Sequence, residues 1–153
     1  MLSNRARDWM EDKALDQVQY VNMAVDIHHI FPKKWCLDNN IDIERRESIV
    51  NKTAISAKTN RTIGGAAPSS YLVAIQNRAQ IASAQLDDLL EAHLVSAEDL
   101  RNDQFDVFFA RRRENLCVLI ESAMGKSVPR DVEDGHGEED SAQFGEWEIE
   151  EGD

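Results

Sequence analysis

The order of apolar and polar positions predicts a mainly helical chain with two short strands in its first half. Apolar residues recur at roughly helical spacing over residues 4–24, which predicts an amphipathic helix. Residues 25–31 form an apolar run that Pro32 ends, as expected of a strand. A second strand is expected over 53–57, and it leads into a helical segment over 58–63 that two glycines end.

The segment between the two strands, 33–48, reads as a loop with one helical turn at 33–37. Beyond residue 67 the pattern is helical. It predicts three helices, which start at Pro68, at a cap on Ser83, and at Asn102 or Asp103, and a short turn that a capping box of Ser96 and Asp99 begins. The last helix, 104–124, has an apolar face made of Phe105, Phe108, Phe109, Leu116, Leu119 and Ile120. The predicted fold class is α+β and mostly α, with a two-strand and helix motif (25–65) in a helical scaffold (4–24 and 68–125).

Charge divides the 153 residues into a domain and a tail. The net charge is −12, but eleven acidic residues and no Lys or Arg lie in 131–153. Removing those eleven from the 29 acidic residues leaves 18 against 17 basic residues in 1–130. We therefore expect one domain over 1–130 and an acidic, disordered tail over 131–153. The whole-chain charge is a poor guide to what this domain binds, because segment 28–61 has seven basic and four acidic residues.

Two single cysteines, Cys36 and Cys117, argue against a zinc ribbon and against a disulfide-built fold. We expect both thiols to be small buried hydrophobes. The N-terminus shows no apolar signal region, and no stretch approaches the roughly 20 apolar residues of a membrane span. These features predict a soluble cytoplasmic protein.

The order of features in this stretch is the one needed for a one-metal phosphodiesterase. Two adjacent histidines on a strand are followed by a loop, a second strand and a helix that carries an asparagine. Adjacent strand residues point to opposite faces, so His28 and His29 cannot both be core residues on one side of a sheet. A histidine suits a general base that activates water, because its unperturbed pKa lies near working pH. Asn60 offers an amide oxygen, a ligand that favours Mg²⁺ or Mn²⁺ over zinc. This pattern predicts a divalent cation as cofactor and a phosphodiester as substrate.

The segment 26–61 resembles the motif of HNH endonucleases, also called ββα-metal or His-Me finger nucleases. The letters HHIFP, which begin at His28, are similar to the family's first-strand signature of Asp, His or Glu followed by His-Ile-x-Pro. The resemblance implies that His28 binds the metal and that His29 is the general base. It also implies that Asn51 fixes the loop and helps to orient the base, while Asn60 is the second protein ligand.

Three details refine this resemblance. The zinc-binding cysteine pairs of many HNH proteins are absent, so the surrounding helices must hold the motif. Position 28 is His where many relatives carry Asp, which leaves the metal open between Mg²⁺ and Mn²⁺. Asp26 shares a strand face with His28 and is a candidate further ligand or orienting group.

The residues expected to contact DNA phosphates are Lys33, Lys34, Lys52, Lys58 and Arg61.

Residues 93–126 are similar to the helical end of GmrSD-type, modification-dependent restriction enzymes. In these proteins a nucleotide-dependent, ParB-like domain senses DNA and an HNH-type domain cuts it. The resemblance implies that this chain is the cleavage half of a restriction or phage-defence protein, and that a sensor or NTPase domain or subunit is its partner. A homodimer is a further possibility, since two cuts in a duplex need two sites or two visits.

Other readings stay open at this point. The chain is alternatively a catalytically silent DNA-binding or protein-interaction module that its acidic tail regulates. Arg111, Arg112 and Arg113 fit either a solvated helix face or a DNA-backbone track. His93 and His136 show no partner spacing and are interpreted as incidental.

Overall fold

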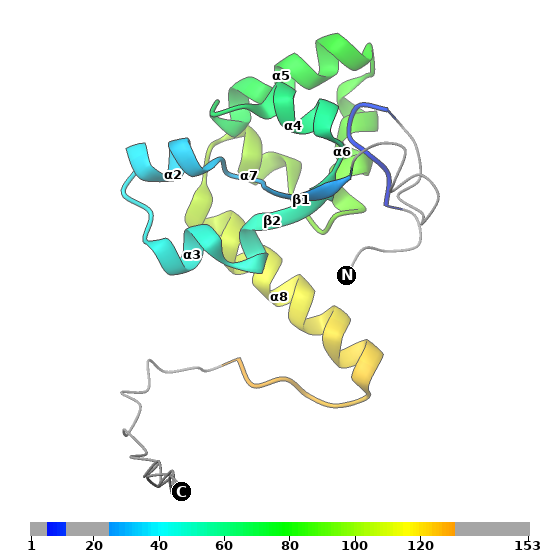
Figure 1. Ribbon diagram of the computed structural model, residues 1–153. Helices are drawn as coiled ribbons and strands as arrows, with labels where there is room; N and C mark the ends of the chain where they lie inside the picture. The colour runs from blue at the N-terminus through cyan, green and yellow to red at the C-terminus, as the bar shows by residue number, and fades with distance from the viewer. Residues whose placement is uncertain (1–5, 12–24, 131–153) are drawn as a thin grey trace, which may run out of the picture.

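The computed structural model describes residues 6–11 and 25–130 and contains one two-stranded antiparallel sheet within them (Figure 1). Strand β1 spans Asp26–His29 and strand β2 spans Lys52–Ile55. His28 pairs with Thr53 across the sheet, and His29 pairs with Lys52. The two predicted strands are confirmed, although β1 is shorter than expected at both ends and β2 starts one residue earlier and ends two residues earlier than expected. With helices making up most of the rest, the fold is α+β and mostly α, as predicted.

The connection between the strands is more regular than the predicted loop. It contains helix α2 (Lys33–Asp38), helix α3 (Ile43–Glu47) and the 3-10 helix η1 (Ile49–Asn51). The helical turn at 33–37 is confirmed, but the loop expected up to residue 48 is wrong. Asp42 begins α3 by accepting a hydrogen bond from the Arg45 N–H at 2.9 Å, and Ser48 begins η1 by accepting one from the Val50 N–H at 3.1 Å. Helices α3 and η1 are therefore each set by a side-chain cap, because three to five residues are too few for a hydrophobic period.

Helix α4 (Ala57–Ile63) follows β2 directly and completes a strand–strand–helix unit. The Ser56 hydroxyl accepts the Thr59 N–H at 3.1 Å and so fixes the first turn. The helix ends at Gly64, whose φ of 53° lies in the region that glycine tolerates best. Both the helix and its glycine stop agree with the sequence prediction.

Four further helices form the scaffold, and α4 and α5 lie on the opposite side of the sheet from α8 (Figure 1). They are α5 (Pro68–Ala79), α6 (Ser83–Glu91), α7 (Ala97–Arg101) and α8 (Phe105–Met124). The three predicted helices are confirmed, and the short turn predicted after Ser96 is the five-residue helix α7, which Ser96 caps as expected.

Two predicted helix caps were wrong. Helix α6 begins after Ala82, so Ser83 is its first residue rather than its cap. Asp103 does not cap α8, which begins after Gln104 without a side-chain cap. The Asp103 carboxylate instead accepts the Ser69 N–H at 2.8 Å and the Ser69 hydroxyl at 2.7 Å. Asp103 thereby pairs with the donors of Ser69 in the first turn of α5, which is distant from it in sequence.

The aromatic ring of Phe31 lies at the centre of the core. Its centroid is 4.9 Å from those of Trp35 and Phe108 and 5.2 Å from that of Phe105. Phe31 comes two residues after His29, so this packing anchors the end of β1. The other buried members of the cluster are Trp9, Ile30, Cys36, Ile55, Ile63, Tyr71, Leu72, Ile75, Leu86, Leu90, Val95, Ala97, Leu100, Phe105 and Phe108.

The C-terminal half of α8 projects from this body (Figure 1). Phe105, Phe108 and Leu116 of the predicted apolar face are buried. Leu119 and Ile120 are exposed, so that face was predicted one turn too long. Cys36 is buried as expected, whereas Cys117, beside Leu116, is only half-buried.

The described part of the predicted first helix is not helical. Residues 6–11 contain a bridge residue and a turn, and the remainder of 4–24 lies outside the described residues. Buried Asp8 explains the turn, because its carboxylate accepts the N–H groups of Met10 and Ser56 at 3.0 and 2.7 Å and the Thr59 hydroxyl at 2.7 Å. Burial raises the pKa of Asp8, but these hydrogen bonds outweigh it and hold the pKa below its usual value.

Within the described ranges, no helix is both long enough and apolar enough to cross a bilayer. The predicted acidic tail, 131–153, lies outside the described residues, as does His136.

Candidate functional site

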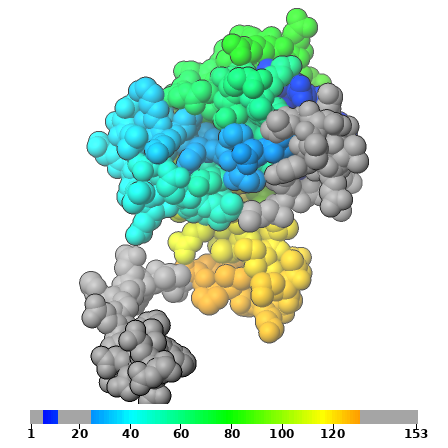
Figure 2. Space-filling view, in the orientation of Figure 1, coloured from blue at the N-terminus to red at the C-terminus, as the bar shows by residue number. Residues whose placement is uncertain are grey.

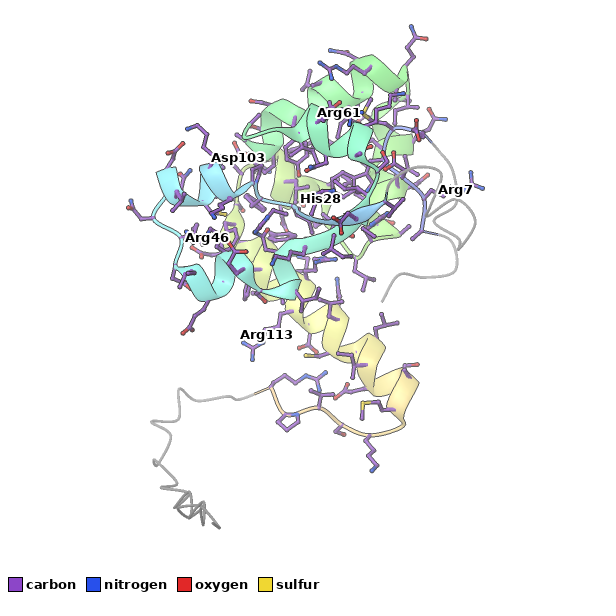
Figure 3. The ribbon with its side chains drawn as sticks, in the orientation of Figure 1. Arg7, His28, Arg46, Arg61, Asp103 and Arg113 are labelled. Atoms are coloured by element: carbon purple, nitrogen blue, oxygen red, sulfur yellow. The ribbon has the colours of Figure 1, made fainter. Side chains whose placement is uncertain are left out.

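A cleft of about 250 Å³ lies where the end of β1, the start of α2 and the end of α4 meet. On the face shown in Figure 2, β1 (blue) lies between α2 (cyan) and α4 (blue-green). Figure 3 shows His28 on β1, with Arg61 on α4 beyond it. The residues that line the cleft are His28, His29, Pro32, Lys33, Lys34, Asn60, Ile63, Gly64 and Gly65.

Three predicted site residues meet at this cleft. His28 and His29 come from β1 and Asn60 comes from α4, and all three side chains are half-buried. Both histidines reach the same cleft although they are neighbours, because β1 ends at His29 and the chain turns there into α2. The cleft therefore offers two imidazole rings and one amide group, each open to solvent on one side.

Three hollows elsewhere are larger, at about 430, 550 and 320 Å³. The first lies against Trp9 and α6, the second lies between α6, α7 and α8, and the third lies between α2 and the start of α8. None of them has a histidine among its lining residues. The smaller cleft is the candidate site because of its chemistry, not its size.

Asn51 is fully buried, and its side chain joins three backbone groups. Its Oδ1 accepts the Phe31 N–H at 2.9 Å, and its Nδ2 donates to the carbonyl oxygens of Phe31 at 3.0 Å and Arg46 at 3.1 Å. The Asn51 carbonyl also accepts the Ile30 N–H at 2.8 Å. This side chain holds α3 against the chain that follows β1. Its contribution to catalysis stays a prediction.

Glu47 lies beside His29 and was not predicted as a site residue. Its Oε2 is 3.0 Å from His29 Nε2 and 3.3 Å from Lys52 Nζ, and its Oε1 is 3.2 Å from Arg46 Nε. Desolvation raises the pKa of Glu47, but hydrogen bonds from Arg46, Lys52 and His29 outweigh it and lower the pKa to about 2. The sequence analysis missed Glu47 because it did not predict helix α3. Asp42, the residue that caps this helix, was the one feature of the sequence that indicated it.

Asp26 does not join the cleft. It is exposed, it is not among the lining residues, and its Oδ1 accepts the N–H of its neighbour Ile27 at 2.7 Å. Over the described part of the chain, no three His, Cys, Asp or Glu side chains are grouped to hold a metal ion. A protein-bound cation here would therefore depend on a mixed pair, His28 and Asn60.

The five predicted phosphate-binding residues divide into two groups. Lys33 and Lys34 line the cleft at the start of α2, and Lys34 also pairs with Asp38 at 2.6 Å. Arg61 is exposed on α4, the helix on which Figure 3 labels it. Lys52 pairs with Glu47 at 3.3 Å and Lys58 with Glu11 at 3.6 Å. Three of the five, Lys34, Lys52 and Lys58, thus have carboxylate partners within the fold.

Gly65 lets Lys34 lie across the rim of the cleft. A Cβ atom on Gly65 would lie 3.1 Å from Lys34 Cδ and 3.3 Å from its Cβ. Such contacts are tighter than ordinary van der Waals packing, so a side chain here would displace Lys34.

Arg112 fits neither the solvated face nor the DNA track considered for the three consecutive arginines. It is 3 % exposed. Its guanidinium donates to the carbonyl oxygens of Val50 at 2.5 Å and Lys52 at 2.8 Å, and to those of Ile49 and His93 at 3.2 to 3.3 Å. Burial lowers the pKa of Arg112 to about 10, so the group stays charged at neutral pH. It ties α8 to the backbone on both sides of Asn51.

His93 is structural rather than incidental. It is 1 % exposed, with Nδ1 2.7 Å from Thr53 Oγ1 and Nε2 2.8 Å from the Arg7 carbonyl oxygen. Thr53 is the β2 partner of His28, so His93 supports the sheet from the side of the scaffold. Burial is the main cause that lowers the pKa of His93, to about 4.

Comparison with known proteins shows that this chain matches part of a longer protein, and it indicates no activity. The chain is 29 % identical over 124 residues to the uncharacterized protein MJ0686 of Methanocaldococcus jannaschii. The match covers 72 % of this chain and 21 % of that protein, so the chain spans about a fifth of the curated relative's length. No family model matches the chain, and no solved structure does.

Proposed function

We propose that this chain is the cleavage domain of a metal-dependent DNA endonuclease of HNH type. The observation that carries the proposal is the cleft that gathers His28, His29 and Asn60 from a strand–strand–helix unit. Asn51 supports it by fixing the loop beside β1, which is the position its predicted role requires.

His28 and Asn60 would hold the divalent cation, Mg²⁺ or Mn²⁺. One imidazole nitrogen and one amide oxygen fit an ion that fills its other positions with water and phosphate oxygens. Such an ion supplies neutralisation of charge on the phosphate and on the departing 3′ oxygen. Asp26 is outside the cleft and would act only as a more distant, orienting group.

His29 would act as general base. Hydrolysis forms a bond from a water oxygen to phosphorus and breaks the bond from phosphorus to the 3′ oxygen, while His29 takes a proton from the water. A half-buried ring at the cleft suits this task, because it is accessible to water and held on one side by Glu47.

Lys33, Lys34 and Arg61 would contact the DNA backbone on the two sides of the cleft, with Lys52 and Lys58 contributing at its edges. Phosphate contacts carry no base information, so the domain cuts with little sequence preference. Selectivity, for modified bases in a restriction or phage-defence role, would come from a sensor or NTPase partner acting with it in the cytoplasm. A homodimer would supply the second cut in a duplex.

The test is plasmid cleavage by the purified chain with Mg²⁺, Mn²⁺ or EDTA. We expect metal-dependent relaxation or linearisation, lost in His29→Ala and Asn60→Ala and kept in Asn39→Ala, an exposed asparagine outside the cleft. DNA binding by His29→Ala should stay near that of the wild type, because a base acts on water rather than on the backbone.

Substantial residual cleavage by His29→Ala would contradict the assignment of the base. DNA retention by a folded wild type that hydrolyses nothing with any metal would instead support the silent binding module.

A further inference from the structure

We infer that Glu47 is a positioning residue for His29: its carboxylate fixes the imidazole in the tautomer with the proton on Nε2 and leaves Nδ1 as the accepting nitrogen. The catalytic part of this inference rests on the proposed function, while the tautomer can be tested without it. Glu47 lies on α3, the helix that was expected to be loop.

The assignment follows from the hydrogen-bonding capacity of the two groups. An ionised carboxylate can only accept, so the ring nitrogen 3.0 Å from Glu47 Oε2 must carry the proton. A neutral imidazole has one N–H, so Nδ1 of His29 is then the acceptor. Among the described residues, no hydrogen bond engages Nδ1 of His29.

Glu47 is held as an anion by two cations. Arg46 Nε lies 3.2 Å from its Oε1, and Lys52 Nζ lies 3.3 Å from its Oε2. Although desolvation raises the pKa of Glu47, the three donors lower it to about 2, so it remains ionised throughout the working range of a nuclease. The carboxylate therefore orients the ring and does not compete with it for the proton of water.

The backbone fixes the distance between the two groups. Asn51 Nδ2 donates to the carbonyl of Arg46, the residue before Glu47. The same side chain accepts the N–H of Phe31, two residues after His29. One buried amide thus joins the end of α3 to the end of β1, and Glu47 and His29 are brought together whatever the cleft contains.

A purely structural role for Glu47, as an anchor for Arg46 and Lys52, predicts different results. It predicts that removing the carboxylate lowers the fraction of folded protein and leaves the His29 ring unchanged in the molecules that fold. Two variants separate the roles, because Glu47→Ala removes the acceptor and Glu47→Gln keeps a neutral one. Glu44→Ala is the matched control, since Glu44 is exposed on the same helix.

The first readout is the imidazole nitrogen spectrum of ¹⁵N-histidine-labelled protein at neutral pH, with His29 assigned from its loss in His29→Ala. We expect a single Nε2–H tautomer in the wild type, in Glu47→Gln and in Glu44→Ala. Glu47→Ala should show shifts averaged between the two tautomers. Unchanged His29 signals in Glu47→Ala would overturn the inference, whether or not the chain cleaves DNA.

The second readout is the split between kcat and KM in plasmid cleavage. Glu47→Ala should lower kcat about 10- to 100-fold, as loss of a partner that orients a working histidine does, with KM for DNA changed less than about twofold. Glu47→Gln should recover most of kcat, and Glu44→Ala should match the wild type.

A wild-type kcat in Glu47→Ala would reject the positioning role and leave the proposed function standing. Absence of cleavage by the wild type would reject the proposed function. The nitrogen spectrum would then decide the tautomer of His29 by itself.

Discussion

At the scale of single residues, buried polar groups do most to define the site. Asn51, His93 and Arg112 are each almost inaccessible to solvent, and each joins chain segments that are distant in sequence. None of them repeats at a helical or strand period. Each side chain makes at least two hydrogen bonds, so its removal leaves polar groups without partners in a dry environment.

Asn51→Ala tests this directly. It leaves the Phe31 N–H and the Arg46 carbonyl oxygen without the side chain that pairs them, and it leaves the Phe31 carbonyl oxygen with only the Cys36 thiol at 3.4 Å. We therefore expect a loss of about 3 kcal/mol in the free energy of unfolding. Urea unfolding followed by circular dichroism measures it. Asn39→Ala, which removes one exposed bond to the Trp35 carbonyl, should cost less than about 0.5 kcal/mol. Equal losses in the two variants would contradict the role given to Asn51.

His93 makes stability depend on pH. The unfolded chain binds a proton at this residue below about pH 6.5, whereas the folded chain excludes it until about pH 4, because burial disfavours the charged ring. The free energy of unfolding is therefore full above pH 6.5 and falls as the pH drops toward 4. The total loss is on the order of 3 kcal/mol.

Urea unfolding of the wild type and His93→Gln, each near neutral pH and near pH 4.5, measures this effect. The variant should be less stable near neutral pH but should lose less on acidification, since carboxylate titrations are common to both proteins. An identical pH dependence in the two proteins would exclude His93 as its source.

At the scale of elements, α8 holds the site although none of its residues lines the cleft. Arg112 donates to the carbonyl oxygens of Ile49, Val50 and Lys52, which surround Asn51 in η1 and at the start of β2. The helix therefore stabilises the loop that carries Asn51.

Arg112→Met should lower the free energy of unfolding by about 3 to 5 kcal/mol, because four carbonyl oxygens lose a buried charged donor. Arg112→Lys should recover little, since an ammonium lacks the planar fork that reaches several carbonyls at once. Thermal unfolding and amide exchange over residues 49–52 provide the measurements. Arg113→Met, at an exposed neighbour, is the control and should be close to wild type.

The sequence predicts the strands, α4 and the long helices because each has a period, a breaker or a cap within a few residues. It predicts that His28, His29 and Asn60 gather, because two short strands and a helix place them there. It does not predict α3, which is too short to show a period, and so it misses Glu47. It also misreads Asp103, because a carboxylate next to a helix start looks like its cap even when its partner is Ser69, on another helix.

At the scale of the whole molecule, opposite charges are separated along the chain. The segment 28–61 has a net positive charge, and eleven acidic residues follow residue 130. Arg130, the last described residue, is fixed to α8 by ion pairs with Glu114 and Glu121. The acidic segment therefore follows directly after a residue whose position on α8 is fixed.

Deleting 131–153 should strengthen binding of a short DNA duplex, because it removes eleven negative charges from a chain that we propose binds DNA. We expect a gain of roughly 3- to 10-fold at about 50 mM salt that shrinks at about 300 mM, where charges are screened. Fluorescence anisotropy measures the affinity, and a Gly/Ser tail of equal length controls for bulk. No change at low salt would count against regulation by the tail.

The contacts of Arg112 also have a consequence for protein synthesis, because Arg112 comes later in the chain than the residues of the site. A ribosome makes His28, His29, Asn51 and Asn60 well before it makes Arg112. Until α8 has left the exit tunnel, the backbone around Asn51 lacks the guanidinium that will hold it. A nascent chain thus carries every candidate catalytic residue without the finished cleft, and a transcript broken before α8 encodes the motif but not the site.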